Sequence, residues 1–259
     1  MKKILLLLVT GLFALACINK NQTNEPPKNS ELIQQNYKGK VQRLEEVPYK
    51  VDSTGKIGEI DSCCIFVAEL NEKGYTTRWY NKDKKGVISF LRNLNRFDNG
   101  QFKEWNDTIN GKKYRSMVLQ IDNDGKYSGA KSYDSAGKVD GYFTDFKENE
   151  YGEMTAFKHY KTDSSLIGTW TAEYDKSIWL GSTTTDSTGK VNGTYKNKLD
   201  DKGNSIEFTS TIVTKDSTTK KVETYKYNSY DDQGNWTQRT EYENGKPIKV
   251  AKRNFKYYK

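Results

Sequence analysis

The sequence predicts an all-β fold, an antiparallel meander of hairpin repeats that forms a curved or partly closed sheet. The 259 residues include 18 Tyr, 10 Phe and 5 Trp, and aromatic and β-branched residues favour strands. From Tyr37 onward, short runs of such residues alternate with polar turns in which Asp or Asn precedes Gly. No proline occurs between Pro48 and Pro247, which suits uninterrupted strands.

Residues 1–16 have the layout of an export signal. Lys2 and Lys3 precede an apolar run that ends near Phe13, and Ala14-Leu15-Ala16 stand directly before Cys17. The apolar run is too short to span a bilayer. This segment resembles the lipobox of bacterial lipoproteins, which implies that Cys17 is acylated, with palmitate or a similar chain, and becomes the mature N-terminus. The alternative is ordinary cleavage after Ala16.

The sequence from 17 to 35 is expected to be the lipidated Cys and a flexible tether, because it is polar and carries two of the four prolines. The resemblance to lipoproteins then places the protein in the bacterial cell envelope, anchored to a membrane through its N-terminal lipid. Ile18 is not acidic, which in the usual sorting pattern of such lipoproteins favours the outer membrane. Residues 36–259 are the predicted β-hairpin repeat domain.

Several runs within this domain show strand patterns. The run Cys63–Leu70 is apolar on both faces and predicts a covered, central strand. The segment 87–97 fits both helical and strand spacing, and its neighbours favour a strand. Alternating apolar residues predict half-buried strands in two further places, at Met117, Leu119 and Ile121 and at Ile206, Phe208 and Ile212.

Turns that close hairpins separate these runs. Asn and Asp bond their own backbone, while Gly adopts positive φ without a steric penalty. The turns with this chemistry are 52–55, 71–74, 123–125, 134–137, 186–189, 200–203, 231–234 and 244–245.

The segment Tyr230-Asp-Asp-Gln-Gly-Asn-Trp236, continued to Gly245, carries a recognisable repeat unit that is echoed at 133–137 and 199–203. It resembles the YD-repeat (RHS-type) family and related hairpin-repeat lipoproteins, in which an aromatic opens each unit, Asp turns the chain and Gly permits the turn. The match is good from 225 to 246, loose from about 120 to 205, and limited to turn chemistry before 110. The resemblance implies a string of antiparallel hairpins joined into one curved sheet.

The residues that most enzymes use are scarce, so no catalytic residue, metal site or cofactor is expected. His159 is the single histidine, which leaves no His cluster for zinc, and a structural role in a strand is favoured over a catalytic one. No phosphate-binding or dinucleotide-binding loop occurs. Asp122-Asn-Asp-Gly125 starts like a calcium loop but lacks the distal Glu.

Cys63 and Cys64 are adjacent, and in a strand they point to opposite faces. Two small buried thiols are favoured, while a vicinal or intermolecular disulfide stays open.

The composition therefore favours a non-enzymatic protein that acts as a binding or structural module through its sheet surface. The resemblance to lipoproteins implies that this protein is lipid-anchored in the envelope. The aromatic residues expected on or near that surface are Trp170, Trp179, Trp236, Tyr225, Tyr227 and Tyr242, and flat rings suit a glycan or a protein partner. The lysines are spread along the chain, so nucleic acid is not expected as a partner. Two alternatives stay open: a carboxylate-based hydrolase of envelope or dietary glycans, and an immunity or accessory protein of a secreted toxin.

Overall fold

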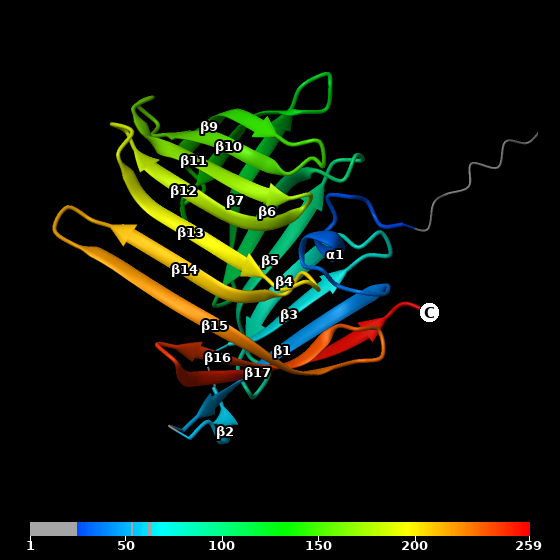
Figure 1. Ribbon diagram of the computed structural model, residues 1–259. Coiled ribbons are helices and arrows are strands. Elements are labelled where there is room, and N and C mark those ends of the chain that lie inside the picture. The colour runs from blue at the N-terminus through cyan, green and yellow to red at the C-terminus, as the bar shows by residue number, and fades with distance from the viewer. Residues whose placement is uncertain (1–24, 53, 62–63) are drawn as a thin grey trace, which may run out of the picture.

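Strands are the main elements of the described part of the chain. The computed structural model describes residues 25–259 except 53, 62 and 63, and in this part of the chain one short helix and seventeen strands occur (Figure 1). They are α1 (Glu31–Gln34), β1 (Val41–Val51), β2 (Ile57–Ile60), β3 (Ile65–Leu70), β4 (Thr76–Lys82), β5 (Ile88–Arg96), β6 (Phe102–Ile109), β7 (Lys112–Ile121), β8 (Tyr127–Tyr133), β9 (Val139–Glu148), β10 (Met154–Tyr160), β11 (Leu166–Asp175), β12 (Ile178–Asp186), β13 (Val191–Leu199), β14 (Ser205–Val213), β15 (Thr218–Tyr230), β16 (Trp236–Glu243) and β17 (Lys246–Tyr257).

The strands form a closed 16-strand barrel. From β3 to β17 each strand pairs antiparallel with the next, and β1 closes the ring because it pairs with β17 on one edge and with β3 on the other. The short strand β2 extends the line of β3 along β1 and adds no further member to the wall. The predicted antiparallel meander is confirmed, but the prediction of a curved or partly closed sheet is wrong, since pairing of the first and last strands leaves no open edge.

The hairpin turns have the predicted chemistry. At the β12–β13 turn, the Oδ1 of Asp186 accepts the N–H groups of Thr188 and Lys190 at 2.9 and 3.1 Å. Gly189 closes this turn at a φ of +85°, a conformation that costs a glycine little. The same arrangement of an Asp or Asn and a positive-φ Gly recurs at most of the other connections.

Three predicted strands are confirmed and one is shorter than expected. Segment 87–97 contains β5. Met117, Leu119 and Ile121 lie on β7, and Ile206, Phe208 and Ile212 lie on β14. The apolar run predicted over 63–70 gives β3 only from Ile65 onward. Cys63 lies outside the described residues, and Cys64 is a free, exposed cysteine rather than a buried one.

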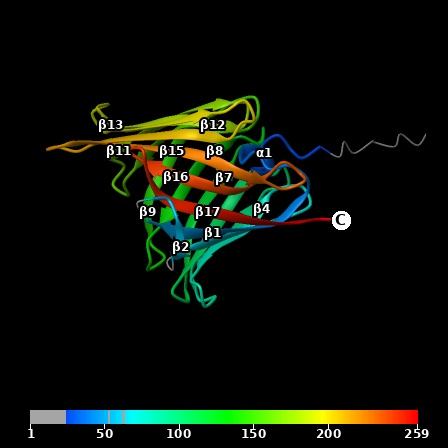
Figure 2. The same cartoon turned by 60° about the horizontal axis from the view of Figure 1, so that its bottom comes forward.

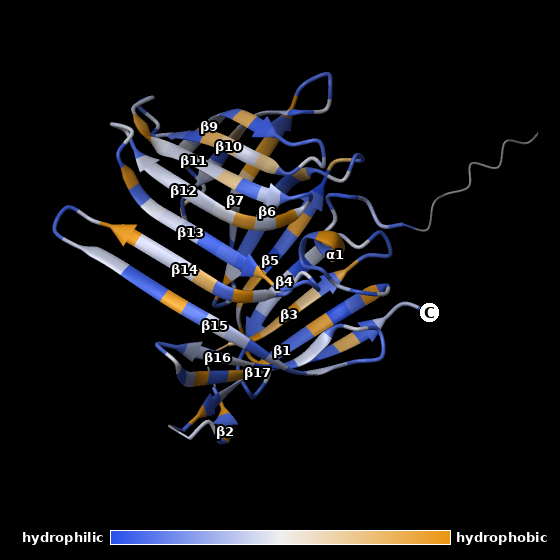
Figure 3. Cartoon of the chain, in the orientation of Figure 1, coloured by the Kyte–Doolittle hydropathy of each residue, from blue (hydrophilic) through white to orange (hydrophobic). Residues whose placement is uncertain are grey.

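The register places polar side chains on the outer wall. One row of paired residues crosses five strands from β1 to β6 with Arg43, Glu69, Arg78, Asn93 and Asn106. A second outer row crosses β11 to β15 with Thr171, Thr183, Thr194, Thr211 and Lys220. The adjacent inner row from β1 to β6 contains Leu44, Ala68, Trp79, Arg92 and Asp107. Alternating hydrophilic and hydrophobic bands run along the strands (Figure 3).

The two ends of the barrel differ. The proximal end, on the right of Figure 1, carries α1 and the C-terminus, and the view in Figure 2 places both on the same side of the barrel. The opposite, distal end carries the eight hairpin connections that begin with the β1–β2 turn and finish with the β16–β17 turn. In the described part of the chain, no helix is long and apolar enough to cross a bilayer.

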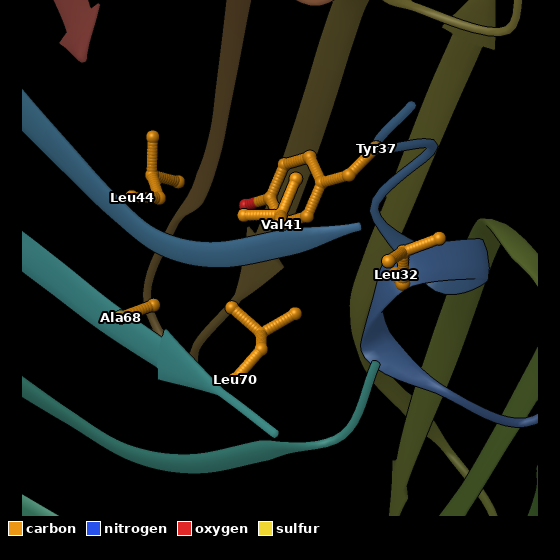
Figure 4. Close-up of a cluster of buried hydrophobic side chains, with 6 residues drawn as sticks. All are labelled: Leu32, Tyr37, Val41, Leu44, Ala68 and Leu70. Carbon is orange, nitrogen blue, oxygen red and sulfur yellow. The ribbon is translucent and has the colours of Figure 1, made fainter. Parts of the chain in front are cut away.

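Residues 25–40 pack against the proximal end. Ser30 is fully buried and Leu32 is 8% exposed, and Leu32 joins Tyr37, Val41, Leu44, Ala68 and Leu70 in a core cluster (Figure 4). The backbone N–H of Leu32 donates to the carbonyl of Gly74 at 3.1 Å. Residues 25–35 therefore belong to the folded part, although the tether was predicted to extend to residue 35.

Candidate binding cavity inside the barrel

The interior of the barrel contains a cavity of about 540 Å³ with aromatic walls. Strands β6 to β12 supply the wall, and the aromatic side chains that line it are Phe102, Trp105, Tyr127, Phe143, Phe146, Phe157, Tyr174 and Trp179, with Met117, Leu119 and Met154 between them. Its volume lies in the usual range of small-molecule sites, which are mostly apolar with a few polar groups.

The rings pack against one another and fix the shape of the wall. Phe157 contacts Phe143 edge-on at 5.5 Å between ring centroids and Phe146 at 6.0 Å. Phe143 and Phe146 are three residues apart, yet both line the cavity. Asp145, which lies between them, has a φ of +55°, and the β9–β10 register shifts there, so strict alternation is broken at this point.

The N-terminal segment forms a polar roof over this cavity through Asn29, Gln34 and Gln35. The Nε2 of Gln34 donates to the Oε2 of Glu153 at 2.8 Å. Glu153 is 5% exposed, and burial raises its pKa to about 7. Its Oε1 atom has no hydrogen-bond partner among the described residues. The roof thus holds one carboxyl group that changes its charge near neutral pH.

Arg96 connects the roof to the wall. Its guanidinium pairs with Glu31 of α1 and donates to the carbonyl of Gly100 at 2.7 Å. It also lies over the ring of Phe102, 3.9 Å from the centroid. The second oxygen of Glu31 accepts the N–H of Thr76 at 2.8 Å. Both oxygens of Glu31 are therefore engaged in holding α1 in place.

A second cavity of about 540 Å³ lies beside the first and shares Phe102 and Trp105 with it. Its wall includes three arginines, Arg92, Arg239 and Arg253, and Glu46. The Nε of Arg253 donates to the Oε2 of Glu46 at 2.8 Å. Although burial opposes it, the charges of Arg253 and Arg239 lower the pKa of Glu46 below its ordinary value.

Arg92 makes a two-pronged ion pair with Asp107. Its Nε and one terminal nitrogen each lie 2.7 Å from a different oxygen of Asp107. Asp107 is 6% exposed and also accepts the hydroxyl of Ser116 at 2.7 Å. Paired geometry of this kind compensates for the loss of water around a buried charge.

Comparisons with known proteins identify the fold alone. No family model and no curated protein matches the chain. The chain is similar to the crystal structure of a porin-like protein from Bacteroides uniformis, with a TM-score of 0.51 and 12% identity over 83% of this chain and 96% of that chain.

Two other similar structures have TM-scores under 0.5. A Photorhabdus luminescens Tc holotoxin pore has a TM-score of 0.34 and 13% identity over 81% of this chain and 13% of that chain. A porin-like protein from Bacteroides vulgatus has a TM-score of 0.28 and 10% identity over 85% of this chain and 99% of that chain.

Most of the aromatic residues predicted for a binding surface lie on the inner wall instead. Trp179 lines the first cavity, and Trp170 stacks on Phe157 at 5.0 Å between centroids. Tyr242 pairs with Thr224, on the opposite face from the pair Tyr225 and Glu241. The expected open aromatic face is therefore corrected to an aromatic interior, because closure of the sheet encloses that face.

The remaining predicted residues also lie inside the barrel. Trp236 is 6% exposed and lies beneath the guanidinium of Arg253, 3.6 Å from its ring centroid. The hydroxyl of Tyr225 donates to Glu223 at 2.9 Å, and that of Tyr227 donates to the Ser205 carbonyl at 2.7 Å. Cys17 lies outside the described residues.

His159 is part of the inner aromatic packing. Its ring stacks on Phe143 at 4.2 Å between centroids, and burial lowers its pKa. In the described part of the chain, no three His, Cys, Asp or Glu side chains gather as a metal site would require.

Proposed function

We propose that this protein is a non-enzymatic binding protein of the cell envelope whose barrel holds an apolar ligand inside. One observation carries the proposal: aromatic side chains line the interior, while two rows of charged, amide and threonine side chains lie on the outer wall. A barrel that spans a bilayer has the opposite pattern, with an apolar band outside and a polar interior. The polar wall therefore favours a barrel surrounded by water.

The cavity indicates the class of ligand. Its wall accepts an acyl chain or a flat apolar ring, and its roof offers Gln34 and Glu153 to a single polar group. Below pH 7 the carboxyl of Glu153 is mostly protonated and can donate a hydrogen bond, because its pKa is about 7. We infer a ligand with an extended apolar body and one small polar end.

Anchoring through Cys17 is the second part of the proposal. The described chain begins at residue 25, and residues 25–40 lie at the proximal end. Acyl chains on Cys17 would hold that end of the barrel toward the membrane, at the distance that residues 17–24 allow. The supporting evidence is the resemblance of residues 1–17 to a lipoprotein signal.

The test compares two neighbouring residues that face opposite ways. Met117 lines the cavity, and Val118 faces outward because it pairs with Glu104 and Lys131 on the polar wall. Met117→Glu puts a carboxylate into the apolar cavity, whereas Val118→Glu adds one to a wall that already carries charges. The probe is N-phenylnaphthylamine, whose fluorescence rises in apolar sites, with palmitate as competitor.

We expect saturable binding of the dye that palmitate displaces, at least about tenfold weaker binding for Met117→Glu, and unchanged binding for Val118→Glu. Quenching of tryptophan fluorescence should follow the same order. Absence of saturable binding, or equal loss in both variants, would contradict a ligand site inside the barrel.

A second candidate function is hydrolysis by carboxylates, and Glu153 is the observation that favours it. A carboxyl group with a pKa near 7 suits a general acid. Against this, the nearby Glu31 has both oxygens engaged by Arg96 and Thr76, so it is not free to attack a substrate. Release of sugar from envelope or dietary glycans by the wild-type protein, and its loss in Glu153→Gln, would favour the hydrolase.

A further inference from the structure

Exposed aliphatic side chains gather at the distal end. In the described part of the chain, eight of the nine exposed large hydrophobic residues lie there, and only Tyr230 lies at the proximal end. Six of them come from six different hairpins: Val87, Ile109, Ile167, Val191, Ile212 and Ile248. Ile57 and Ile88 complete the set, which we call the distal rim.

The exposure of the distal rim is substantial. Val87 is 63% exposed, Ile212 is 46% exposed and Ile109 is 43% exposed. Single exposed apolar residues are ordinary on a protein surface, but a group of eight aliphatic ones at one end is not. All eight are Ile or Val, and each lies within four residues of a hairpin connection.

Positive charge accompanies these aliphatic residues. The eight distal connections carry seven lysines and, with Asp186 of the β12–β13 turn, six aspartates. Lys112, Lys113 and Lys246 lie exposed beside the two shortest of them, and Glu243 lies opposite Lys246. Five of the six aspartates accept a backbone N–H inside their own turn. The seven proximal connections carry the opposite balance, with ten acidic residues and four lysines.

We propose that the distal rim docks onto an anionic lipid membrane. Two contributions bind proteins to such a surface. Aliphatic side chains enter the boundary between headgroups and acyl chains, and lysines attract the anionic headgroups. The acidic connections at the proximal end disfavour that end for an anionic surface, so the rim would meet a different membrane from the one that the proposed lipid on Cys17 holds at the proximal end. This inference concerns the distal mouth of the barrel and does not depend on what the cavity holds.

The test uses the chain from residue 17 to 259 with Cys17→Ser, which retains every described residue and carries no lipid. Co-sedimentation is measured with vesicles of phosphatidylcholine containing about a third phosphatidylglycerol, and with vesicles of phosphatidylcholine alone. We expect binding to the anionic vesicles that is at least about tenfold tighter than to the neutral ones and that weakens with added salt.

Two sets of variants locate the contact. The aliphatic variant carries Val87→Ser, Ile109→Ser and Ile212→Ser, and the charge variant carries Lys84→Glu, Lys85→Glu and Lys113→Glu. The matched control carries Lys73→Glu, Lys126→Glu and Lys202→Glu at the proximal connections. All of these side chains are exposed, so thermal unfolding should stay unchanged and serves as the check on folding.

We expect each distal variant to lose at least about tenfold in vesicle affinity and the proximal control to keep wild-type affinity. Equal loss in the control would overturn the proposal, because it would indicate attraction by net charge alone. Full affinity in the aliphatic variant would also overturn it, since the rim would then not enter the membrane. Lack of binding to either vesicle would overturn it as well and would favour a protein partner for the rim.

Discussion

Replacing Glu153 with glutamine is expected to remove a pH dependence from the stability of the barrel. Glu153 is 5% exposed, and burial raises its pKa from 4.5 to about 7. One pKa unit corresponds to about 1.4 kcal/mol, so the ionised carboxylate costs the folded state about 3 kcal/mol above pH 7. Glutamine keeps the size of the side chain and an oxygen that accepts from Gln34.

The sign follows from proton binding. Between pH 4.5 and 7 the folded protein holds the proton on Glu153 while the unfolded chain has released it, so stability falls as pH rises through this window. The glutamine variant lacks this contribution. For a domain of this size, a change of 1 kcal/mol in the free energy of unfolding moves the Tm by about 2 to 4 °C. When the pH rises from 4.5 to 8, the Tm of the wild type should therefore fall by about 6 to 12 °C more than the Tm of the glutamine variant.

Thermal unfolding followed by circular dichroism between pH 4 and 8.5 measures this difference. The control is Glu150→Gln, an exposed glutamate in the same turn, which should follow the wild-type profile. If the wild type and Glu153→Gln gave parallel profiles across the window, burial of Glu153 would not control its ionisation and the argument would be refuted.

Three other changes have definite expected outcomes. Gly100→Ala should destabilise the protein by at least about 2 kcal/mol more than Gly137→Ala. Both glycines have positive φ, but of the two only a Cβ at position 100 would meet the buried hydroxyl of Tyr75, at 1.9 Å, so equal Tm shifts would contradict this prediction. Arg92→Met should lower the free energy of unfolding in urea by about 3 to 5 kcal/mol, because it leaves the carboxylate of Asp107 buried without its partner. Adding Asp107→Asn should recover part of that free energy, and no recovery would argue against the ion pair as the cause. Cys17→Ser should abolish labelling by a fatty-acid probe, and labelling that persists would exclude Cys17 as the acylation site.

The local features of the fold could be predicted from the sequence because short-range chemistry determines them. Asp186 and Gly189 identify their turn without any knowledge of the rest of the chain. Closure could not be predicted in this way, because it depends on Val41 at one end of the sequence meeting Tyr257 at the other. No local pattern specifies that pairing.

The cavity was harder to predict than the strands. Alternation predicts that alternate residues share a face, but shifts in register such as the one beside Asp145 change which residues face inward. Glu153 and Gln34 are 119 residues apart, and Gln34 belongs to a segment that looks like a tether by composition. The sequence identifies which residues are aromatic, whereas the side of the sheet that they occupy follows only from closure.

The pairing of β1 with β17 has a consequence for how the chain acquires its structure. Every other join in the wall links strands that are close in sequence, with only the short strand β2 between β1 and β3, so hairpins can form early and locally. The last join must wait for the final strand to arrive, and until then β1 and β17 both present unpaired edges that can capture other chains. Assembly of this barrel should therefore be slow at its final step, and a chain truncated before β17 should aggregate rather than form a smaller barrel.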